Sequence, residues 1–137
     1  MSRGLLNNNP GNLKVFKSHF FIGEKRQTTD PPFRQFYEID FGYRAMFKQL
    51  EMYGECGINS IKTIITRWSG ETKEIIEAYV NFICQKLDKQ PNEILNMMDK
   101  NTLIQLVSAI SQYYNVSEAI YEEVMAGYEL FMTTKIK

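Results

Sequence analysis

The chain has 137 residues, of which 44% are hydrophobic and 13% aromatic, and its 16 basic and 16 acidic side chains cancel. That length favours a single folded domain over residues 1–137, with one sizeable core. Zero net charge and the lack of an apolar run of roughly 20 residues argue against nucleic acid and against a membrane as partners.

Cysteine and histidine are too few for a metal site. The chain has two cysteines, Cys56 and Cys84, and one histidine, His19, so no zinc-type ligand spacing can be assembled. We therefore expect free thiols, no metal and no cofactor. A lone imidazole also gives little basis for Ser-His-Asp or Cys-His catalysis, and no phosphate-binding or dinucleotide motif is present.

The N-terminal part is predicted to be loop-rich. Turn-forming residues fill positions 7–12, including Asn7, Asn8, Asn9 and Asn12, and predict a specific loop. Its amides can bind their own backbone or face a ligand, and both interpretations stay open. Residues 33–37 alternate enough to predict a short strand, paired in a small hairpin with residues near Val15 or Phe21.

Two amphipathic helices are predicted next, joined by a tight turn that Gly57 closes. The first carries Tyr43, Met46, Phe47, Leu50 and Tyr53, and the second carries Ile58, Ile61, Ile64, Ile65 and Trp68. We expect this pair to form the core, because neither helix can bury its apolar face alone. Trp68 fits either that core or a sugar-stacking surface.

Further helices are predicted to follow in order. They cover apolar positions from Ile75 to Leu87, a short helix from Pro91 to Met98, one capped by Asp99 that runs to Tyr114, and a last one capped by Ser117. The fold class is therefore mainly α, with about six helices and a small irregular or β-hairpin N-terminal part.

Carboxylates remain as candidates for chemistry. A glycosidase needs one carboxyl group kept protonated by an apolar environment, often with a second one nearby. Glu38 lies between Tyr37 and Ile39 in an aromatic-rich segment, and Glu74 begins the third large helix. The alternative for each is a solvated helix face or a partner of the helix dipole.

Several short strings resemble, in their order and spacing, a family of phage and prophage proteins. They are R-G-L-L-N-N-N-P-G-N-L at 3–13, T-D-x-x-F-x-x-F at 29–36, G-Y-R-A at 42–45, Y-G-x-x-G-I-N-S-I-K-T-I-I-T-R-W at 53–68 and A-Y-V at 78–80. Members of that family are described as virion structural proteins or lysozyme-like peptidoglycan-degrading proteins. The resemblance implies a lysozyme-like domain related to peptidoglycan hydrolases and lytic transglycosylases.

The asparagine string also resembles the N-N-x-F-G-I-K of cell-wall glucosaminidases, where that loop borders the glycan groove. In the phage-type family the C-terminal helix often ends in His-Glu-Asn-Gly, and here Tyr113, Tyr114, Asn115 and Val116 stand at those positions. Tyr114 thus replaces the glutamate. A phenol with an ordinary pKa near 10 does not readily protonate a glycosidic oxygen.

The resemblance leaves two functions open. The first is a phage-derived protein that acts on or binds murein glycan, with its cleaving activity retained or degenerate. Glu38 and Glu74 are then the candidate acids, and the substrate-binding residues are Asn7, Asn8, Asn9, Asn12, Trp68, Tyr113 and Tyr114. The alternative is a non-catalytic protein that binds the cell wall or other virion proteins.

A third interpretation is an interaction protein whose methionine-rich helices, with Met97, Met98, Met125 and Met132, contact another chain. No apolar run of signal-peptide length opens the sequence. We therefore expect a protein made in the bacterial cytoplasm that reaches the virion or the cell envelope by another route.

Overall fold

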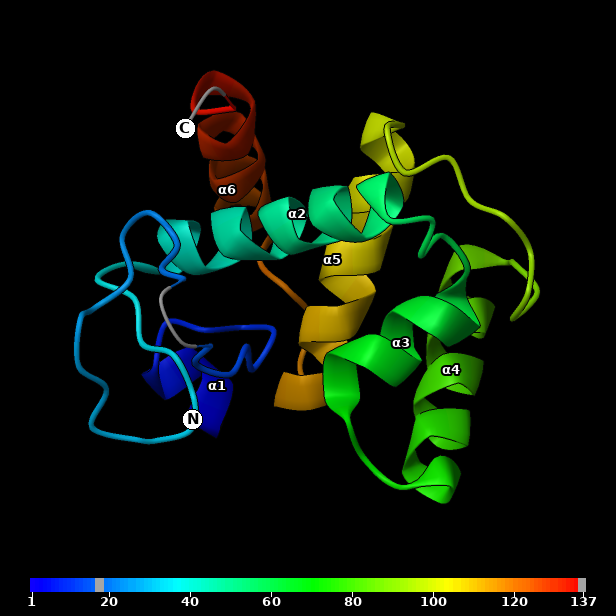
Figure 1. Cartoon of the computed structure of the whole chain (residues 1–137), viewed down its shortest axis with the longest axis horizontal. Coiled ribbons are helices and arrows are strands. Elements are labelled where there is room, and N and C mark those ends of the chain that lie inside the picture. Colours follow the sequence, from blue (N-terminus) through cyan, green and yellow to red (C-terminus); the bar gives the residue numbers. More distant parts are fainter. Residues whose placement is uncertain (17–18, 136–137) are drawn as a thin grey trace.

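The computed structural model describes residues 1–16 and 19–135, and within them it is mainly α-helical, as predicted. Six helices follow one another within these described residues (Figure 1). They are α1 (Arg3–Leu6), α2 (Ile39–Glu55), α3 (Ile61–Ser69), α4 (Lys73–Leu87), α5 (Lys100–Asn115) and α6 (Tyr121–Thr133).

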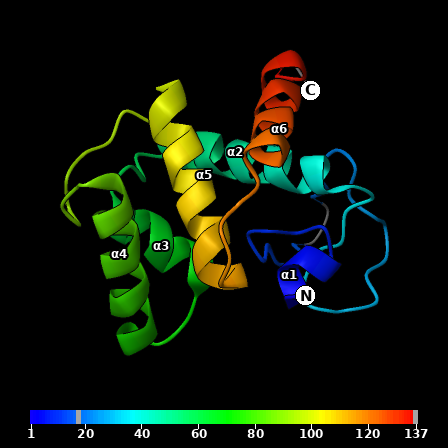
Figure 2. The same cartoon turned by 180° about the vertical axis from the view of Figure 1, so that it is seen from behind.

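Helix α2 runs across the middle of the molecule and connects its two sides. At its N-terminal end lies the N-terminal lobe, which comprises α1 and the loops of residues 7–16 and 19–37. At its other end lie α3 and α4, while α5 and α6 pack along its length (Figures 1 and 2). The lobe contacts the rest of the fold through α2, through the last turn of α5 and through Trp68 of α3.

The apolar face of α2 forms the core, as its spacing predicts. Tyr43, Met46, Phe47 and Leu50 are all at most 1% exposed. Phe47 packs in a stacked arrangement with Phe131 of α6, with ring centroids 5.8 Å apart. Burial of each such side chain stabilises the fold by about 1.5–3 kcal/mol. The α2–α6 crossing is thus the main hydrophobic contact of the fold.

The predicted helical hairpin is confirmed. Gly57 has a φ of 77°, which glycine adopts at little cost. Ser60 then caps α3 in a capping box with Thr63, so that two free N–H groups at the helix start are satisfied. Ile61 and Ile64 are fully buried on the face of α3 that meets the core.

The predicted helix from Pro91 to Met98 is wrong. The N–H of Leu95 donates to the Asn59 carbonyl at 2.8 Å, and the carbonyl of Pro91 accepts from the Lys62 N–H at 3.0 Å. These contacts hold the segment against the α2–α3 connection and engage backbone groups that a local helix would need. Tertiary hydrogen bonds therefore override the local helical pattern.

Caps were predicted with mixed success. Asp99 caps α5, where its side chain accepts from the Thr102 N–H at 2.9 Å. Ser117 does not cap α6, because the chain stays non-helical until Ile120, which is the N-cap residue.

The hairpin predicted for the N-terminal lobe exists only as isolated bridges. They pair Lys14 with Phe33, Phe16 with His19, and Glu24 with Phe36. Helix α1, whose four residues are too few to show a period, was not predicted. Within the described ranges, no helix combines the length and apolarity that crossing a bilayer requires.

Candidate functional site

Asn9 lies at the centre of the asparagine loop, residues 7–12, and is fully buried. Its Nδ2 donates to the carbonyl oxygens of Leu13 and Arg34, both at 2.9 Å, and its Oδ1 accepts from the Leu13 N–H at 2.9 Å. The amide thus makes all of these hydrogen bonds with the backbone. Asn9 holds the loop in shape from inside the lobe.

Asn8 joins the loop to α2. Its Nδ2 donates to the carbonyl oxygens of Phe36 and Tyr37 at 3.1 and 3.3 Å. Its own carbonyl oxygen lies against Gly42, where an added Cβ would come within 2.0 Å of that oxygen. The loop can therefore pack directly on the helix backbone because the residue there is glycine. Asn12 differs from its neighbours, since its Oδ1 is buried without a hydrogen-bond partner among the described residues.

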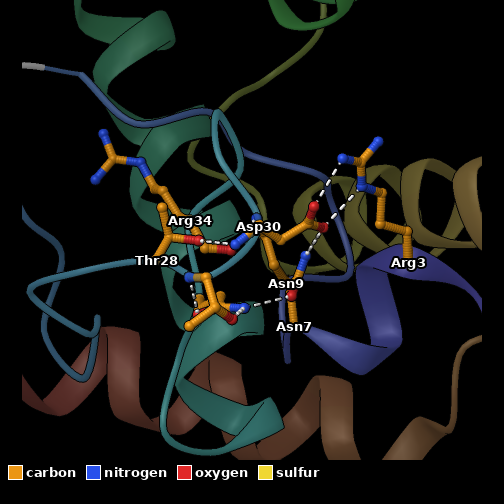
Figure 3. A network of polar contacts seen from close by, with 8 residues as sticks. Arg3, Asn7, Asn9, Thr28, Asp30 and Arg34 are labelled. Carbon is orange, nitrogen blue, oxygen red and sulfur yellow. Dashed lines mark hydrogen bonds and ion pairs between the residues drawn. The ribbon is translucent and has the colours of Figure 1, made fainter.

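A charged network ties α1 to the rest of the lobe (Figure 3). Arg3 donates to both carboxylate oxygens of Asp30 at 2.7 Å, and Asn7 Nδ2 donates to the same carboxylate at 2.9 Å. The Oδ1 of Asn7 accepts from Gln35 at 2.9 Å. The hydrogen bonds from Arg3 first, and from Asn7 second, lower the pKa of Asp30 to about 2. The asparagine and T-D-x-x-F-x-x-F strings thus meet in one network.

This network predicts an acid-dependent stability. A carboxyl whose pKa falls to about 2 on folding stabilises the protein fully above the unfolded pKa, and this contribution disappears as pH falls toward 2. We expect the difference in free energy of unfolding between wild type and Asp30→Asn to be constant near neutral pH. It should shrink between about pH 4 and 2. Urea denaturation across this range measures it, and a difference independent of pH would contradict the prediction.

A groove of about 500 Å³ lies between the N-terminal lobe and the end of α3. Three aromatic residues line it, namely Phe16, Tyr53 and Trp68, together with the polar side chain of Gln49. Phe16 is 72% exposed, so its ring is open to a ligand. Concave sites of this size with apolar walls and a few polar groups are typical of ligand sites.

Trp68 joins the two walls of this groove. Its Nε1 donates to the Gly11 carbonyl at 2.8 Å, and its ring meets Tyr53 edge to face, with centroids 6.1 Å apart. The side chain is half-buried and also lines the groove. Trp68 therefore packs against the asparagine loop and presents part of its surface to the groove at the same time.

Charge in the groove is positive. Lys14 and Arg67 are exposed and line it, and Arg34 lines its inner wall. Arg34 forms a buried ion pair with Glu24, whose side chain is 1% exposed. The Arg34 guanidinium also donates to the carbonyl oxygens of Lys14 and His19 at 2.8 and 3.0 Å. Glu24 and Arg34 therefore hold the wall in place with their charges balanced.

Neither predicted catalytic carboxylate lines this groove. Glu38 is the exposed N-cap residue of α2, beside Asp40, Glu122 and Glu123 in a separate hollow of about 330 Å³. Glu74 is exposed in the first turn of α4. The structure does not bring either residue together with the asparagine loop in one cavity. Among the described residues, no side chain that lines the groove is acidic.

The two predicted sugar-stacking tyrosines lie in an aromatic cluster between α4 and α5. Tyr113 stacks on Tyr79 with centroids 3.9 Å apart and an interplanar angle of 7°. Tyr114 meets Tyr79 edge to face at 5.2 Å. Burial, with a smaller effect of the nearby Glu71 carboxylate, raises the pKa of Tyr114 to about 12. These rings pack on one another, and neither lines the groove.

The last turn of α5 supports the asparagine loop from behind. Asn115 Nδ2 donates to the Pro10 carbonyl at 2.9 Å, and its Oδ1 accepts from the Ser2 hydroxyl. Val116 follows with a φ of 52°, a left-handed conformation that a β-branched residue rarely adopts. The His-Glu-Asn-Gly string of the phage-type family has glycine at the position of Val116. Glycine would adopt this backbone conformation at little cost.

Trp68 is the one predicted site residue that lines this groove, and the residues that sequence reasoning missed include Lys14, Phe16, Tyr53 and Arg67. Phe16 is the one with a signal, because it lies in the short apolar run before the predicted strand at 33–37. Its bridge to His19 brings the residue to the groove. The other three depend on how the lobe meets α2 and α3, which no local pattern describes.

Comparison with known proteins gives one informative relationship. No protein-family model matches the chain. Protein P5 of Pseudoalteromonas phage PM2 is 34% identical to it over 132 residues, which cover 93% of this chain and 81% of the phage protein. An identity of this level over nearly the whole chain establishes common ancestry. The chain therefore belongs to the phage protein family that includes Protein P5 of phage PM2.

Proposed function

We propose that this member of a phage protein family binds the glycan strands of murein in the groove between Phe16 and Trp68, and that it does not cleave them. The proposal makes it a degenerate relative of lysozyme-like hydrolases, made in the bacterial cytoplasm and acting in the virion or at the cell envelope. The groove is about 500 Å³ in volume and lined by aromatic rings and polar groups, a combination that suits a sugar ring.

One observation favours binding over cleavage. Hydrolysis or transglycosylation of a glycosidic bond needs a carboxyl group that can donate a proton at the scissile oxygen. No acidic side chain lines the groove within the described residues. Tyr114, which stands where the resemblance implies a glutamate, has a pKa of about 12 and packs against Tyr79. Its phenol is thus a poor proton donor for this reaction.

Sedimentation with purified insoluble sacculi tests the binding. Wild type is expected to pellet with sacculi, and Phe16→Ser to bind at least about fivefold more weakly, because aromatic side chains in a site carry much of the binding energy. Phe20→Ser is the matched control, since Phe20 is also exposed and in the same lobe but does not line the groove. Equal binding of Phe16→Ser and wild type would reject this groove as the site.

Mass spectrometry of the supernatants tests cleavage in the same samples. Incubation between about pH 4 and 8 covers the range in which a carboxyl with a raised pKa would act. We expect no soluble muropeptides at any of these values. Release of products by wild type would overturn the non-catalytic part of the proposal and leave the glycan site in place.

A structural role in the virion is the second candidate. A hollow of about 420 Å³ lies between α2, α6 and the segment before α5, and its walls include Met97, Met98 and Met132. Methionine side chains adapt to the shape of a protein partner. This role predicts a fixed number of copies in purified particles. It also predicts release of Met98→Ser at a lower urea concentration than wild type, because the lost contact is apolar. Absence of the protein from particles would exclude it.

A further inference from the structure

The groove carries an excess of positive charge that the chain as a whole does not have. Lys14 and Arg67 are exposed along it, and neither forms an ion pair with another described residue. The third cation, Arg34, is balanced by Glu24. Formal net charge over the whole sequence is zero. Two uncompensated cations therefore face one cavity.

These two cations come from opposite walls. Lys14 belongs to the N-terminal lobe, where it bridges to Phe33, and Arg67 lies in the last turn of α3. Burial raises the pKa of Tyr53, and the hydrogen bond with Gln49 first and the Arg67 charge second act against that rise. A ligand in the groove would meet a cation on each side.

Resting on the proposed function, we infer that the groove selects carboxylate-bearing muramyl residues over neutral N-acetylglucosamine. The two sugars share their ring and acetamido group, and N-acetylmuramic acid adds a lactyl ether. That ether ends in a free carboxylate wherever the stem peptide has been removed. Arginine binds such a carboxylate through two parallel hydrogen bonds, and lysine binds it as a point charge. The glycan backbone is then held by stacking and its acidic substituents by Lys14 and Arg67.

Nucleic acid is the competing polyanion, and the groove suits it less well. Proteins that bind nucleic acid tightly neutralise on the order of six to ten phosphates. Only Lys14 and Arg67 are uncompensated along this groove among the described residues. Spaced single carboxylates on a sugar chain match two isolated cations better than a continuous phosphate backbone does.

Binding to matched soluble glycans tests the inference. The probes are murein glycan strands freed of peptides by an amidase, which keep the lactyl carboxylate, and chitin oligosaccharides of equal length. Wild type is expected to bind the murein strands about tenfold more tightly at low salt, and this preference should fall as salt screens the charges. Lys14→Gln with Arg67→Gln should bind both glycans equally.

A charge-matched control separates a local effect from net charge. Lys62→Gln with Lys73→Gln removes two exposed charges from α3 and α4 that do not line the groove, and it should keep the wild-type preference. Equal affinity of wild type for both glycans overturns the inference and leaves the proposed function standing. Binding to neither glycan overturns both. Tighter binding to single-stranded DNA than to murein strands also overturns the inference.

Discussion

Gly42→Ala is expected to detach the N-terminal lobe from α2. The new Cβ would lie 2.0 Å from the Asn8 carbonyl oxygen and 2.8 Å from Cδ of Pro10, distances that only backbone movement can relieve. Alanine gains about 1 kcal/mol of helix propensity over glycine. Overpacking costs about 1–3 kcal/mol and occasionally more. An approach of 2.0 Å to a backbone oxygen places this site at the upper end, so we expect a net loss of about 2 kcal/mol.

Urea denaturation of Gly42→Ala should therefore show a clear drop in the free energy of unfolding, and glycan binding should weaken with it. Gly54→Ala is the control in the same helix, because its added Cβ would meet only the Met97 side chain. The nearest atom, Met97 Cβ at 2.9 Å, has to shift much less than the Asn8 carbonyl at 2.0 Å from the Gly42 position, so we expect a change within about 1 kcal/mol. Equal stabilities of the two variants would mean that the loop does not depend on contact with α2.

Substitution of Asn9 is expected to have an effect of similar or larger size. Asn9→Ala leaves the Arg34 carbonyl oxygen and the Leu13 N–H without their partner inside the lobe. The Leu13 carbonyl oxygen also loses a donor but keeps the Arg34 N–H at 2.9 Å. Each buried polar group left unpaired costs about 1–3 kcal/mol. We expect a total loss of about 3–5 kcal/mol, part of which relaxation or water entry offsets.

Asn9→Asp tests whether the hydrogen bonds of Asn9 or the volume of its side chain stabilise the fold. The carboxylate keeps the acceptor for the Leu13 N–H but turns a negative oxygen toward two carbonyl oxygens, so this variant should be no more stable than Asn9→Ala at pH 7. Asn81→Ala, at an exposed position of α4, should change stability by less than about 0.5 kcal/mol. Thermal and urea denaturation of all three measure the comparison. An Asn9→Asp protein as stable as wild type would rule out the hydrogen bonds as the cause.

Local periodicity predicted most of the helical core, because the apolar spacing of an amphipathic helix repeats within a few turns. Tyr43, Met46 and Phe47 were placed on the buried face of α2, and they are at most 1% exposed. The same approach wrongly predicted a helix in the segment around Leu95. Its backbone bonds to Asn59, 36 residues earlier, and no local pattern contains that contact.

The candidate site was harder to predict than the fold. Asparagine amides in a turn serve a ligand or the chain's own backbone, and sequence composition is the same in both cases. For Asn9 the buried contacts to Leu13 and Arg34 decide for the backbone. Tyr113 and Tyr114 were candidates for sugar stacking, yet the packing of α4 on α5 places them against Tyr79. Which face of an aromatic ring stays open depends on tertiary packing alone.

The support that the end of α5 gives to the asparagine loop also sets the order of events during translation. Ser2 and Pro10 contact Asn115, which the ribosome adds 113 and 105 residues later. Closing such long loops is entropically costly and slow. A nascent chain that has already exposed its asparagine loop cannot complete these contacts until Asn115 has left the ribosome. The packing of that loop behind Trp68 is thus completed late in biogenesis.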